Sequence, residues 1–307
     1  MTKSKFKLYL SEVRAPFFTA TIVPVLLGSV IAWSSFDAFS WGYFFLTLFG
    51  SILVHAGANV VNDYWDHKSG NDEANVEFLR PYTGGSRMIQ KGLLTPKEVL
   101  TEALLLFGGG SLIGLFLTYM RGDGILYLGL VGVLSAYFYT APPFKLVFRG
   151  IGELFIGLDF GVLLTVGAFY VQTGFFALEP LVASLPIALL VAAILYINEF
   201  QDYKADIKVG KNHLVARMGK KRAQVGFGIM MLMTYLLIVG GVIARIISPW
   251  TLLGLITIPI ALKAVKTAKV HYDDYLKLAP ANVGTIMSHL LTGLLMTIGY
   301  MIDKWVS

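Results

Sequence analysis

The sequence predicts an all-α polytopic membrane protein, and three observations point to this class. Hydrophobic residues fill 56% of the 307 positions, charged residues only 14%, and the mean hydropathy is +0.68. Soluble domains carry about 25% charged residues. Long apolar segments follow one another toward the C-terminus, and each approaches the roughly 20 residues that a bilayer-spanning helix needs. This composition excludes disorder and argues against a soluble enzyme.

Nine segments are predicted to cross the membrane as transmembrane helices. They cover residues 15–34, 41–64, 99–119, 124–141, 151–172, 179–199, 224–244, 249–265 and 281–302. No long linker interrupts the series, so we expect a single transmembrane domain over residues 1–307.

The basic residues are distributed unevenly between the two ends of these segments. Of the 25 Lys and Arg, all but Arg121, Arg245 and Lys304 lie before the first segment or near the ends of the even-numbered ones. Cytoplasmic loops are enriched in Lys and Arg. We therefore expect a protein integral to the cell membrane, with its N-terminus and these basic loops in the cytoplasm. The net charge of +6 then reports orientation, and neither a nucleic acid nor an obligate protein partner is expected.

The second predicted span ends in a cluster of amides and carboxylates. Its members are Asn59, Asn62, Asp63 and Asp66. They follow the i, i+3, i+4, i+7 spacing that places side chains on one face of a helix. Gly70 is predicted to end the helix, so that Asp72 can fold back toward the same face.

The sixth predicted span ends in a similar cluster. Asn198, Asp202 and Asp206 are four residues apart and share one helix face. Both clusters have the form Asn-x3-Asp, and both end an even-numbered span. They are therefore predicted to open onto the same side of the membrane, where a bundle can bring them face to face.

Two facing clusters of oxygen ligands favour a Mg²⁺ site. Mg²⁺ binds carboxylates, water and phosphate oxygens in octahedral geometry. The chain has no Cys, and its five His show no zinc-binding spacing. We expect the cofactor Mg²⁺ to be held, together with a diphosphate, by Asn62, Asp63, Asp66, Asp72, Asn198, Asp202 and Asp206.

Basic residues beside the clusters are expected to bind the diphosphate. They are Arg80, Arg87, Lys91, Lys208 and Lys211. A diphosphate site at the end of an apolar bundle indicates a lipid diphosphate whose tail lies among the helices. A Mg²⁺ ion stabilises a leaving diphosphate as a Lewis acid. The allylic cation that remains can then be attacked by an electron-rich carbon.

These clusters resemble the two aspartate-rich motifs of the UbiA superfamily of intramembrane prenyltransferases. The resemblance rests on Asn62-Asp63-x-x-Asp66 and Asp202-x3-Asp206, and it covers nearly the whole chain. It implies nine transmembrane helices around a central cavity that opens laterally to lipid. It also implies Mg²⁺-dependent transfer of a prenyl chain from a polyprenyl diphosphate to an acceptor, which is usually aromatic.

Further stretches resemble the MenA branch, whose enzymes prenylate 1,4-dihydroxy-2-naphthoate in menaquinone biosynthesis. These stretches are Arg14-Ala15-Pro16, residues 23–28, Asp66-x3-Gly70-x-Asp72, residues 152–155 and residues 170–174. Tyr139-x5-Lys145 is similar to a superfamily element whose Tyr faces the reacting carbon and whose Lys holds diphosphate. The resemblance thus implies that the catalytic residues are Asp66, Asp202, Tyr139 and Lys145.

Several of these residues also have simpler explanations. Arg14 can guide an acidic acceptor or the diphosphate, and Lys145 can bind diphosphate, but both also fit the positive-inside rule. Asn59 is expected either to line the substrate site or to make a helix-packing hydrogen bond. The ring of Tyr139 can stabilise an allylic cation, or it can belong to the aromatic belt at the membrane interface.

Two further acidic residues lie in the fifth predicted span. Glu153 is near its cytoplasmic end, where we expect an ion pair with Arg149. Asp159 lies deeper, where ionisable residues are costly, and we expect it either to be functional or to be paired within the bundle.

Other functions remain open at this level. The acceptor can instead be 4-hydroxybenzoate or geranylgeranylglyceryl phosphate. A cation-coupled transporter is the alternative from another class, although transporters commonly place their coupling sites near the bilayer midplane. A membrane scaffold without catalysis leaves the doubled motif unexplained.

Overall fold

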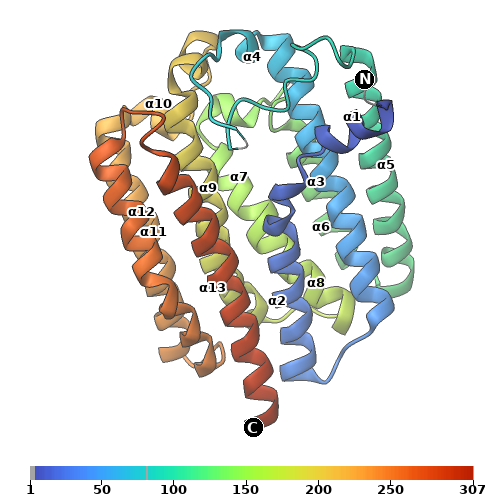
Figure 1. The fold of residues 1–307 in the computed structure, drawn as a ribbon. Helices are drawn as coiled ribbons and strands as arrows, with labels where there is room; N and C mark the ends of the chain where they lie inside the picture. Colours follow the sequence, from blue (N-terminus) through green and yellow to red (C-terminus); the bar gives the residue numbers. More distant parts are fainter. Residues whose placement is uncertain (1–3, 81, 307) are drawn as a thin grey trace.

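The computed structural model describes residues 4–80 and 82–306, and within this range the chain forms helices and no strands. Lys3, one of the basic residues assigned to the cytoplasmic side, lies outside it. Long helices run side by side as a bundle (Figure 1). The helices are α1 (Lys5–Glu12), η1 (Ala15–Phe18), α2 (Thr19–Phe36), α3 (Trp41–Ser69), α4 (Asn71–Ala74), α5 (Pro96–Arg121), α6 (Gly124–Phe138), η2 (Leu146–Arg149), α7 (Gly152–Gly157), η3 (Leu158–Leu163), α8 (Leu164–Thr173), α9 (Leu178–Val209), α10 (Leu214–Met218), α11 (Lys220–Ile243), η4 (Pro249–Thr257), α12 (Ile258–His271) and α13 (Ala279–Val306).

Eight helical segments of the described chain are long and apolar enough to cross a membrane. They match eight of the nine predicted spans and confirm the all-α membrane class. The remaining predicted span, 124–141, is helix α6, which is apolar but has only 15 residues. It is shorter than predicted because the chain leaves the helix just before Pro142 and Pro143, which cannot continue it. The ninth crossing therefore stays a prediction.

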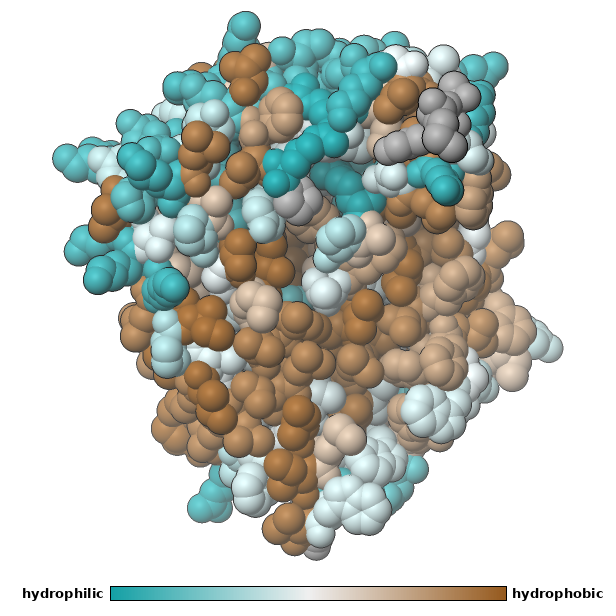
Figure 2. Space-filling view, in the orientation of Figure 1, coloured by the Kyte–Doolittle hydropathy of each residue, from teal (hydrophilic) through white to brown (hydrophobic). Residues whose placement is uncertain are grey.

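The surface of the bundle is divided along its long axis. On the face shown in Figure 2, a broad apolar belt crosses the middle, and hydrophilic residues gather at the end that carries α4 and α10. Large apolar side chains in the belt face outward, such as Leu105 and Leu112 on α5, which are 71% and 69% exposed. Continuous apolar exposure of this kind is suited to lipid rather than to water. The protein is therefore an integral membrane protein.

The two long helices that carry the acidic clusters end in the same way. Helix α3 ends before Gly70 and helix α9 before Gly210, and both glycines adopt the left-handed conformation, with φ of 75° and 83°. A left-handed glycine is the usual helix stop because it has no Cβ. The predicted stop at Gly70 is confirmed, and each helix delivers its last carboxylates to the hydrophilic end of the bundle (Figure 1).

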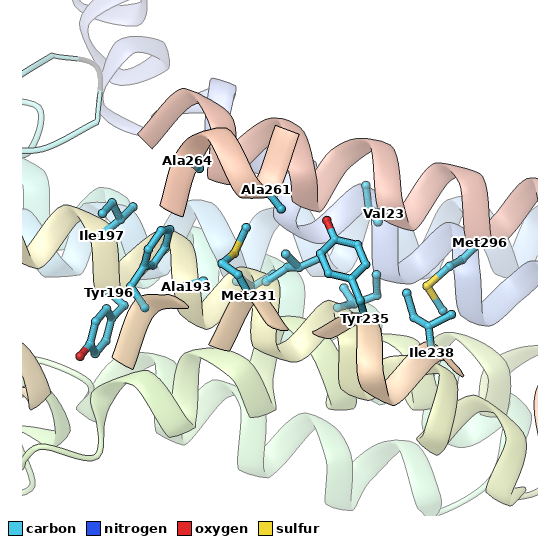
Figure 3. Packing of buried hydrophobic residues seen from close by; sticks show 14 of the residues in the cluster. Val23, Ala193, Tyr196, Ile197, Met231, Tyr235, Ile238, Ala261, Ala264 and Met296 are labelled. Carbon is cyan, nitrogen blue, oxygen red and sulfur yellow. The ribbon is translucent and has the colours of Figure 1, made fainter. Parts of the chain in front are cut away.

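The main hydrophobic core lies between α9, α11, α12 and α13, with α2 against it. Tyr196, Met231, Tyr235, Ile238 and Met296 interdigitate there (Figure 3). In this region the helices pack closely, and α9 is the most deeply buried of the long helices. The carboxylates at the end of α9 therefore stand on a rigid support.

Candidate active site

The two acidic clusters meet at the hydrophilic end of the bundle. Lys211 Nζ lies 2.9 Å from Asp66 Oδ1 on α3 and 3.5 Å from Asp206 Oδ1 on α9. Asn75, just after α4, donates through Nδ2 to Asp202 Oδ1 at 2.6 Å. The clusters are thus joined by direct contacts, as their placement at equivalent helix ends predicts.

In the first cluster, each carboxylate has a distinct environment. Asp63 Oδ2 accepts a hydrogen bond from Ser86 N at 2.8 Å, and Asp63 Oδ1 lies 3.3 Å from the Arg14 guanidinium. Asn62 Nδ2 donates to Asp66 Oδ2 at 3.2 Å. Asp63 therefore anchors the loop before α5, and Asp66 is the carboxylate that faces α9.

Asp72 folds back toward Asp63 and Asp66, as the helix stop at Gly70 predicts. Its side chain is buried, and Gln90 Nε2 donates to Asp72 Oδ2 at 3.0 Å. Burial raises the pKa of Asp72 to about 8, and the charges of Asp66 and Asp63 add to the shift. The Asp63 and Asp72 carboxyls both flank Gly85, where an added Cβ would lie 2.9 Å from Asp63 Oδ1 and 3.5 Å from Asp72 Oδ1.

In the second cluster, an amide network from α13 fixes the position of Asn198. Asn282 Nδ2 donates to Asn198 Oδ1 at 2.7 Å and to Gln201 Oε1 at 3.1 Å. Asn198 Oδ1 accepts this bond with one of its two lone pairs, so a second lone pair remains for a cation. Its role as a metal ligand stays a prediction.

The loop after α9 places two cations among the carboxylates. Lys211 is buried; burial alone would lower its pKa, but Asp66 and Asp206 raise it above its usual range. His213 is completely buried, with Nε2 at 3.2 Å from Asp206 Oδ2. Burial would also lower the pKa of His213, but Asp206 and Glu199 raise it to about 10. The sequence had suggested Lys211; His213 and Glu199 were missed because no local spacing marks them.

The donor set suits a divalent cation. Carboxylates outnumber cationic side chains here: the five aspartates Asp63, Asp66, Asp72, Asp202 and Asp206 are accompanied by the four cations Arg14, Arg87, Lys211 and His213. Buried charge must be compensated. A hard cation that takes carboxylate oxygens would supply the missing positive charge, so the residues fit Mg²⁺.

Most of the basic residues predicted to bind diphosphate are placed differently from Lys211. The Arg87 guanidinium donates to the carbonyls of Asp72 and Asn75 and lies 4.2 Å from the Phe78 ring centroid. Arg80 donates to the carbonyl of Ser86. Both arginines hold the loop that covers the first cluster. Lys91 and Lys208 are exposed at the surface. The diphosphate contacts of these four residues stay predictions.

Tyr139 and Lys145 lie on either side of the chain reversal after α6. A Cβ on Gly152 would lie 3.3 Å from Tyr139 Cε2, so the Tyr139 ring packs against the start of α7, next to Glu153. Lys145 Nζ lies 5.2 Å from the ring centroid of Phe148. The structure thus places Tyr139 against the start of α7, whereas it shows Lys145 stacked on its own turn; their catalytic roles stay predictions.

Arg14 and Asn59 make packing contacts between the N-terminal segment and α3. Asn59 Nδ2 donates to Val13 O at 3.0 Å, and Arg14 Nη2 donates to Asn59 O at 3.1 Å. These bonds hold the segment before α2 against α3, in agreement with the predicted helix-packing hydrogen bond of Asn59. The substrate contacts of Arg14 and Asn59 stay predictions.

The expected ion pair between Glu153 and Arg149 is wrong. Glu153 Oε1 accepts a hydrogen bond from Leu214 N at 2.7 Å, and the Arg149 guanidinium donates to the carbonyls of Phe144 and Pro143. The left-handed Gly150 between them turns the chain, so that Glu153 at the start of α7 points into the bundle.

An apolar cavity of about 330 Å³ lies between α2, α3, α5, α6, η3 and α8. Its lining on α3 extends to Ala58, one helical turn before Asn62. Asp159 is one of few ionisable lining residues, and its carboxyl contacts Ser135 Oγ at 2.8 Å. The cavity therefore leads along α3 toward the acidic site.

Comparison with known proteins gives consistent results. The model of the UbiA prenyltransferase family matches residues 21–279. The chain is 30% identical to the 1,4-dihydroxy-2-naphthoate octaprenyltransferase of Bacillus subtilis, over 93% of this chain and 89% of that relative. It is 27% identical to the 2-carboxy-1,4-naphthoquinone phytyltransferase of Synechocystis, over 96% of this chain and 93% of that relative.

The fold is also found among solved structures. A UbiA homologue from Archaeoglobus fulgidus, solved bound to GPP and Mg²⁺, superposes with a TM-score of 0.61. The match covers 95% of this chain and 99% of the homologue at 14% sequence identity. At that identity the likeness concerns the arrangement of the helices.

Proposed function

The chain belongs to the UbiA prenyltransferase family, and we propose that it transfers a polyprenyl group from a polyprenyl diphosphate to 1,4-dihydroxy-2-naphthoate in a Mg²⁺-dependent reaction. The prenyltransferase class follows from the family. The naphthoate acceptor is supported by the relatives in Bacillus subtilis and Synechocystis, whose acceptors are both naphthalene derivatives. The proposal assigns the activity to one transmembrane domain over residues 1–307.

The observation that carries this proposal is the junction of the two acidic clusters at Lys211, next to an apolar cavity. A lipid diphosphate has the same two-part character. Its charged head matches the hydrophilic end of the bundle, and its apolar tail matches the cavity between the helices. A soluble diphosphate without an apolar tail would leave the cavity between the helices unfilled.

In this proposal the side chains of the two helix ends hold the diphosphate head. Asp66, Asp202 and Asp206, with Asn62, Asp63, Asp72 and Asn198 beside them, are assigned to Mg²⁺ and the diphosphate. Bound Mg²⁺ would supply Lewis-acid stabilisation of the leaving diphosphate. Lys211 would donate to a phosphate oxygen as a compact point charge, and Tyr139 would offer its ring face to the developing allylic cation.

The uneven distribution of Lys and Arg supports a cytoplasmic active site. The basic loops and both acidic clusters lie at the hydrophilic end of the bundle. By the positive-inside rule we propose that this end faces the cytoplasm.

A direct assay tests the proposed reaction. Purified protein in liposomes is given a labelled polyprenyl diphosphate, Mg²⁺ or EDTA, and one acceptor at a time: 1,4-dihydroxy-2-naphthoate, 4-hydroxybenzoate or geranylgeranylglyceryl phosphate. The proposal expects Mg²⁺-dependent product with the naphthoate. Product with another acceptor but none with the naphthoate would show that the proposed acceptor is wrong and that the proposed prenyl transfer is right.

The same preparation separates prenyl transfer from transport. Loss of diphosphate binding in Asp66→Ala and Asp202→Ala is expected for the enzyme. Unchanged diphosphate binding together with altered cation flux across the liposome would overturn the enzyme in favour of a cation-coupled transporter.

A further inference from the structure

Asp159 places an acidic side chain in the wall of the apolar cavity, inside a membrane span. It lies on η3, a π-helical stretch, and such stretches are frequent at functional sites. Gly157 and Gly161 turn one side of η3 toward α9, where a Cβ on Gly161 would lie 2.3 Å from Ala188 Cα. Asp159 is two residues from each glycine, so its side chain points to the opposite side, toward α6 and the cavity.

The contacts of the Asp159 carboxyl leave one of its oxygens able to accept a further hydrogen bond. Both oxygens lie 2.8 Å from Ser135 Oγ on α6. The same hydroxyl lies 2.7 Å from Val131 O and 3.1 Å from Gly132 O, but it has a single hydrogen to donate. With a proton on Asp159, one carboxyl oxygen donates to Ser135 Oγ and the hydroxyl donates to Val131 O. The other carboxyl oxygen then keeps its acceptor position, and no charge is placed inside the membrane.

Two flat rings lie beside Asp159 in the cavity wall. Phe160 and His55 both line the cavity, and their ring centroids are 4.5 Å apart in an edge-to-face arrangement. Thr21 Oγ1 lies 2.8 Å from His55 Nδ1 and holds the histidine ring in place. Flat apolar walls with one hydrogen-bond acceptor suit an aromatic ring that carries a hydroxyl. An isoprenoid tail has no donor and would leave the Asp159 oxygen unpaired.

These residues lie at the end of the cavity that is nearer to the acidic site. His55 shares one face of α3 with Asn62 and Asp66, and the helical rise places it about 10 Å from Asn62 along the axis. Leu46, near the other end of α3, lines the far part of the cavity. In prenyl transfer the acceptor has to reach the carbon that the diphosphate leaves. The acceptor ring therefore belongs at the end near His55, and the prenyl tail belongs in the far part.

We propose that Asp159, as a neutral acid held by Ser135, is a specificity-determining residue that accepts a hydrogen bond from a ring hydroxyl of the aromatic acceptor. This inference deepens the proposed function and rests on it, because it concerns the acceptor of that reaction. In 1,4-dihydroxy-2-naphthoate the 1-hydroxyl bonds to the neighbouring carboxylate, which leaves the 4-hydroxyl as the available donor. Binding of that hydroxyl would orient the ring, so that the same carbon always faces the prenyl group.

Equilibrium binding of two naphthoates that differ by one hydroxyl tests this subsite in the full chain. Purified protein in detergent, with Mg²⁺ and inorganic diphosphate, is titrated without oxygen with 1,4-dihydroxy-2-naphthoate or 1-hydroxy-2-naphthoate, and ligand fluorescence gives each Kd. The wild-type protein should bind the dihydroxy compound about tenfold more tightly. Asp159→Leu should bring this ratio close to one. Asp159→Asn should preserve it, because the amide keeps a carbonyl oxygen and a donor to Ser135.

Thr118→Val is the matched control for the loss of a polar group from the same cavity. Thr118 lines the far part of the cavity, and its hydroxyl donates to Gly114 O within α5. The variant should keep the wild-type ratio. Equal wild-type binding of the two naphthoates would overturn the subsite, as would a ratio that survives Asp159→Leu or is lost in Asp159→Asn. Retained binding of a polyprenyl diphosphate with Mg²⁺ verifies that Asp159→Leu is folded.

A second pair of ligands, 4-hydroxybenzoate and benzoate, separates this inference from the proposed acceptor. A preference for the hydroxyl in this pair alone, lost in Asp159→Leu, would support the subsite and overturn the naphthoate as acceptor. No preference for the hydroxyl in either pair would overturn the subsite, even where the assay of prenyl transfer gives product with the naphthoate.

Discussion

The part of the bundle built by α3, α5, α6 and α8 encloses a cavity, whereas the part built by α9, α11, α12 and α13 is solid. In the most apolar 18-residue stretch of α9, 72% of the residues are buried, against 22% in that of α5. We call these parts the cavity half and the solid half. Each contributes one acidic cluster, so the candidate site lies where they meet.

Two glycines, one in each half, differ in the space around them. A Cβ on Gly293 of α13 would come within 2.1 Å of Val23 Cγ1, so this glycine allows α13 and α2 to touch. A Cβ on Gly114 of α5 would meet nothing within 4 Å, although Gly114 lines the cavity. Tight glycine contacts also occur in the cavity half, where a Cβ on Gly110 would come within 2.6 Å of Val54 Cγ2. The halves therefore differ in the open space left beside α5. In the proposed function the cavity half would receive the flexible part of the substrate, and the solid half would hold the reacting end in place.

The largest effect is expected at the junction of the halves. Asp66→Asn in the cavity half and Asp202→Asn in the solid half should each lower kcat/KM by about 10³-fold, because a ligand to a charge-stabilising cation contributes several kcal/mol. The measurement is prenyl transfer at saturating Mg²⁺, with Glu179→Gln, a half-buried carboxyl at the opposite end of α9, as the control. A loss confined to one helix would show that only one half carries the chemistry.

Phe227→Ala should lower the stability of the protein, because Phe227 belongs to the closely packed core of the solid half. Phe227 on α11 is completely buried, so its truncation leaves a cavity and should cost about 3 kcal/mol of unfolding free energy. Reversible unfolding in mixed micelles measures the loss, and Val225→Ala on the lipid-facing side of α11 is the control. The preference of the remaining folded enzyme for prenyl chain length should not change. A change would mean that the substrate chain reaches this half.

Gly114→Leu should fill the cavity without disturbing the packing around it. We expect discrimination against long polyprenyl diphosphates to rise roughly tenfold or more, since one misfitting methylene is worth about 1–3 kcal/mol. Activity with a short prenyl diphosphate should be kept. Gly108→Leu, at an exposed position on the same helix with nothing within 4 Å, is the matched control. Equal losses for short and long chains would remove the cavity from the proposed substrate path.

Asn282→Leu should have the smallest effect and tests how the solid half supports the site. The change removes the donor to Asn198 and Gln201 and leaves their oxygens unpaired, at a cost of about 1–3 kcal/mol. We expect a lower unfolding temperature and a modest fall in kcat. Ser288→Ala, also buried on α13, is the control, because Ser288 Oγ has no hydrogen-bond partner in the described chain. Equal behaviour of the two variants would show that the amide network does not position Asn198.

Much of this organisation could be predicted from the sequence because it depends on local rules. Hydropathy located eight of the membrane-spanning segments, and helical periodicity placed Asp66 and Asp206 on the faces where they meet. Gly70 marked the end of α3 because a left-handed residue is needed there. Each of these features follows from neighbours within a few turns of one helix.

The tertiary structure alone decided which side chains complete the site. Lys211 bridges Asp66 and Asp206, while Arg87, another basic residue predicted to bind diphosphate, turns to the carbonyls of its own loop. His213 and Glu199 were invisible to sequence patterns because they meet through a chain reversal. The physical reason is that electrostatic pairing and packing act through space, so segments far apart in the chain determine whether a charge faces a ligand or another part of the protein.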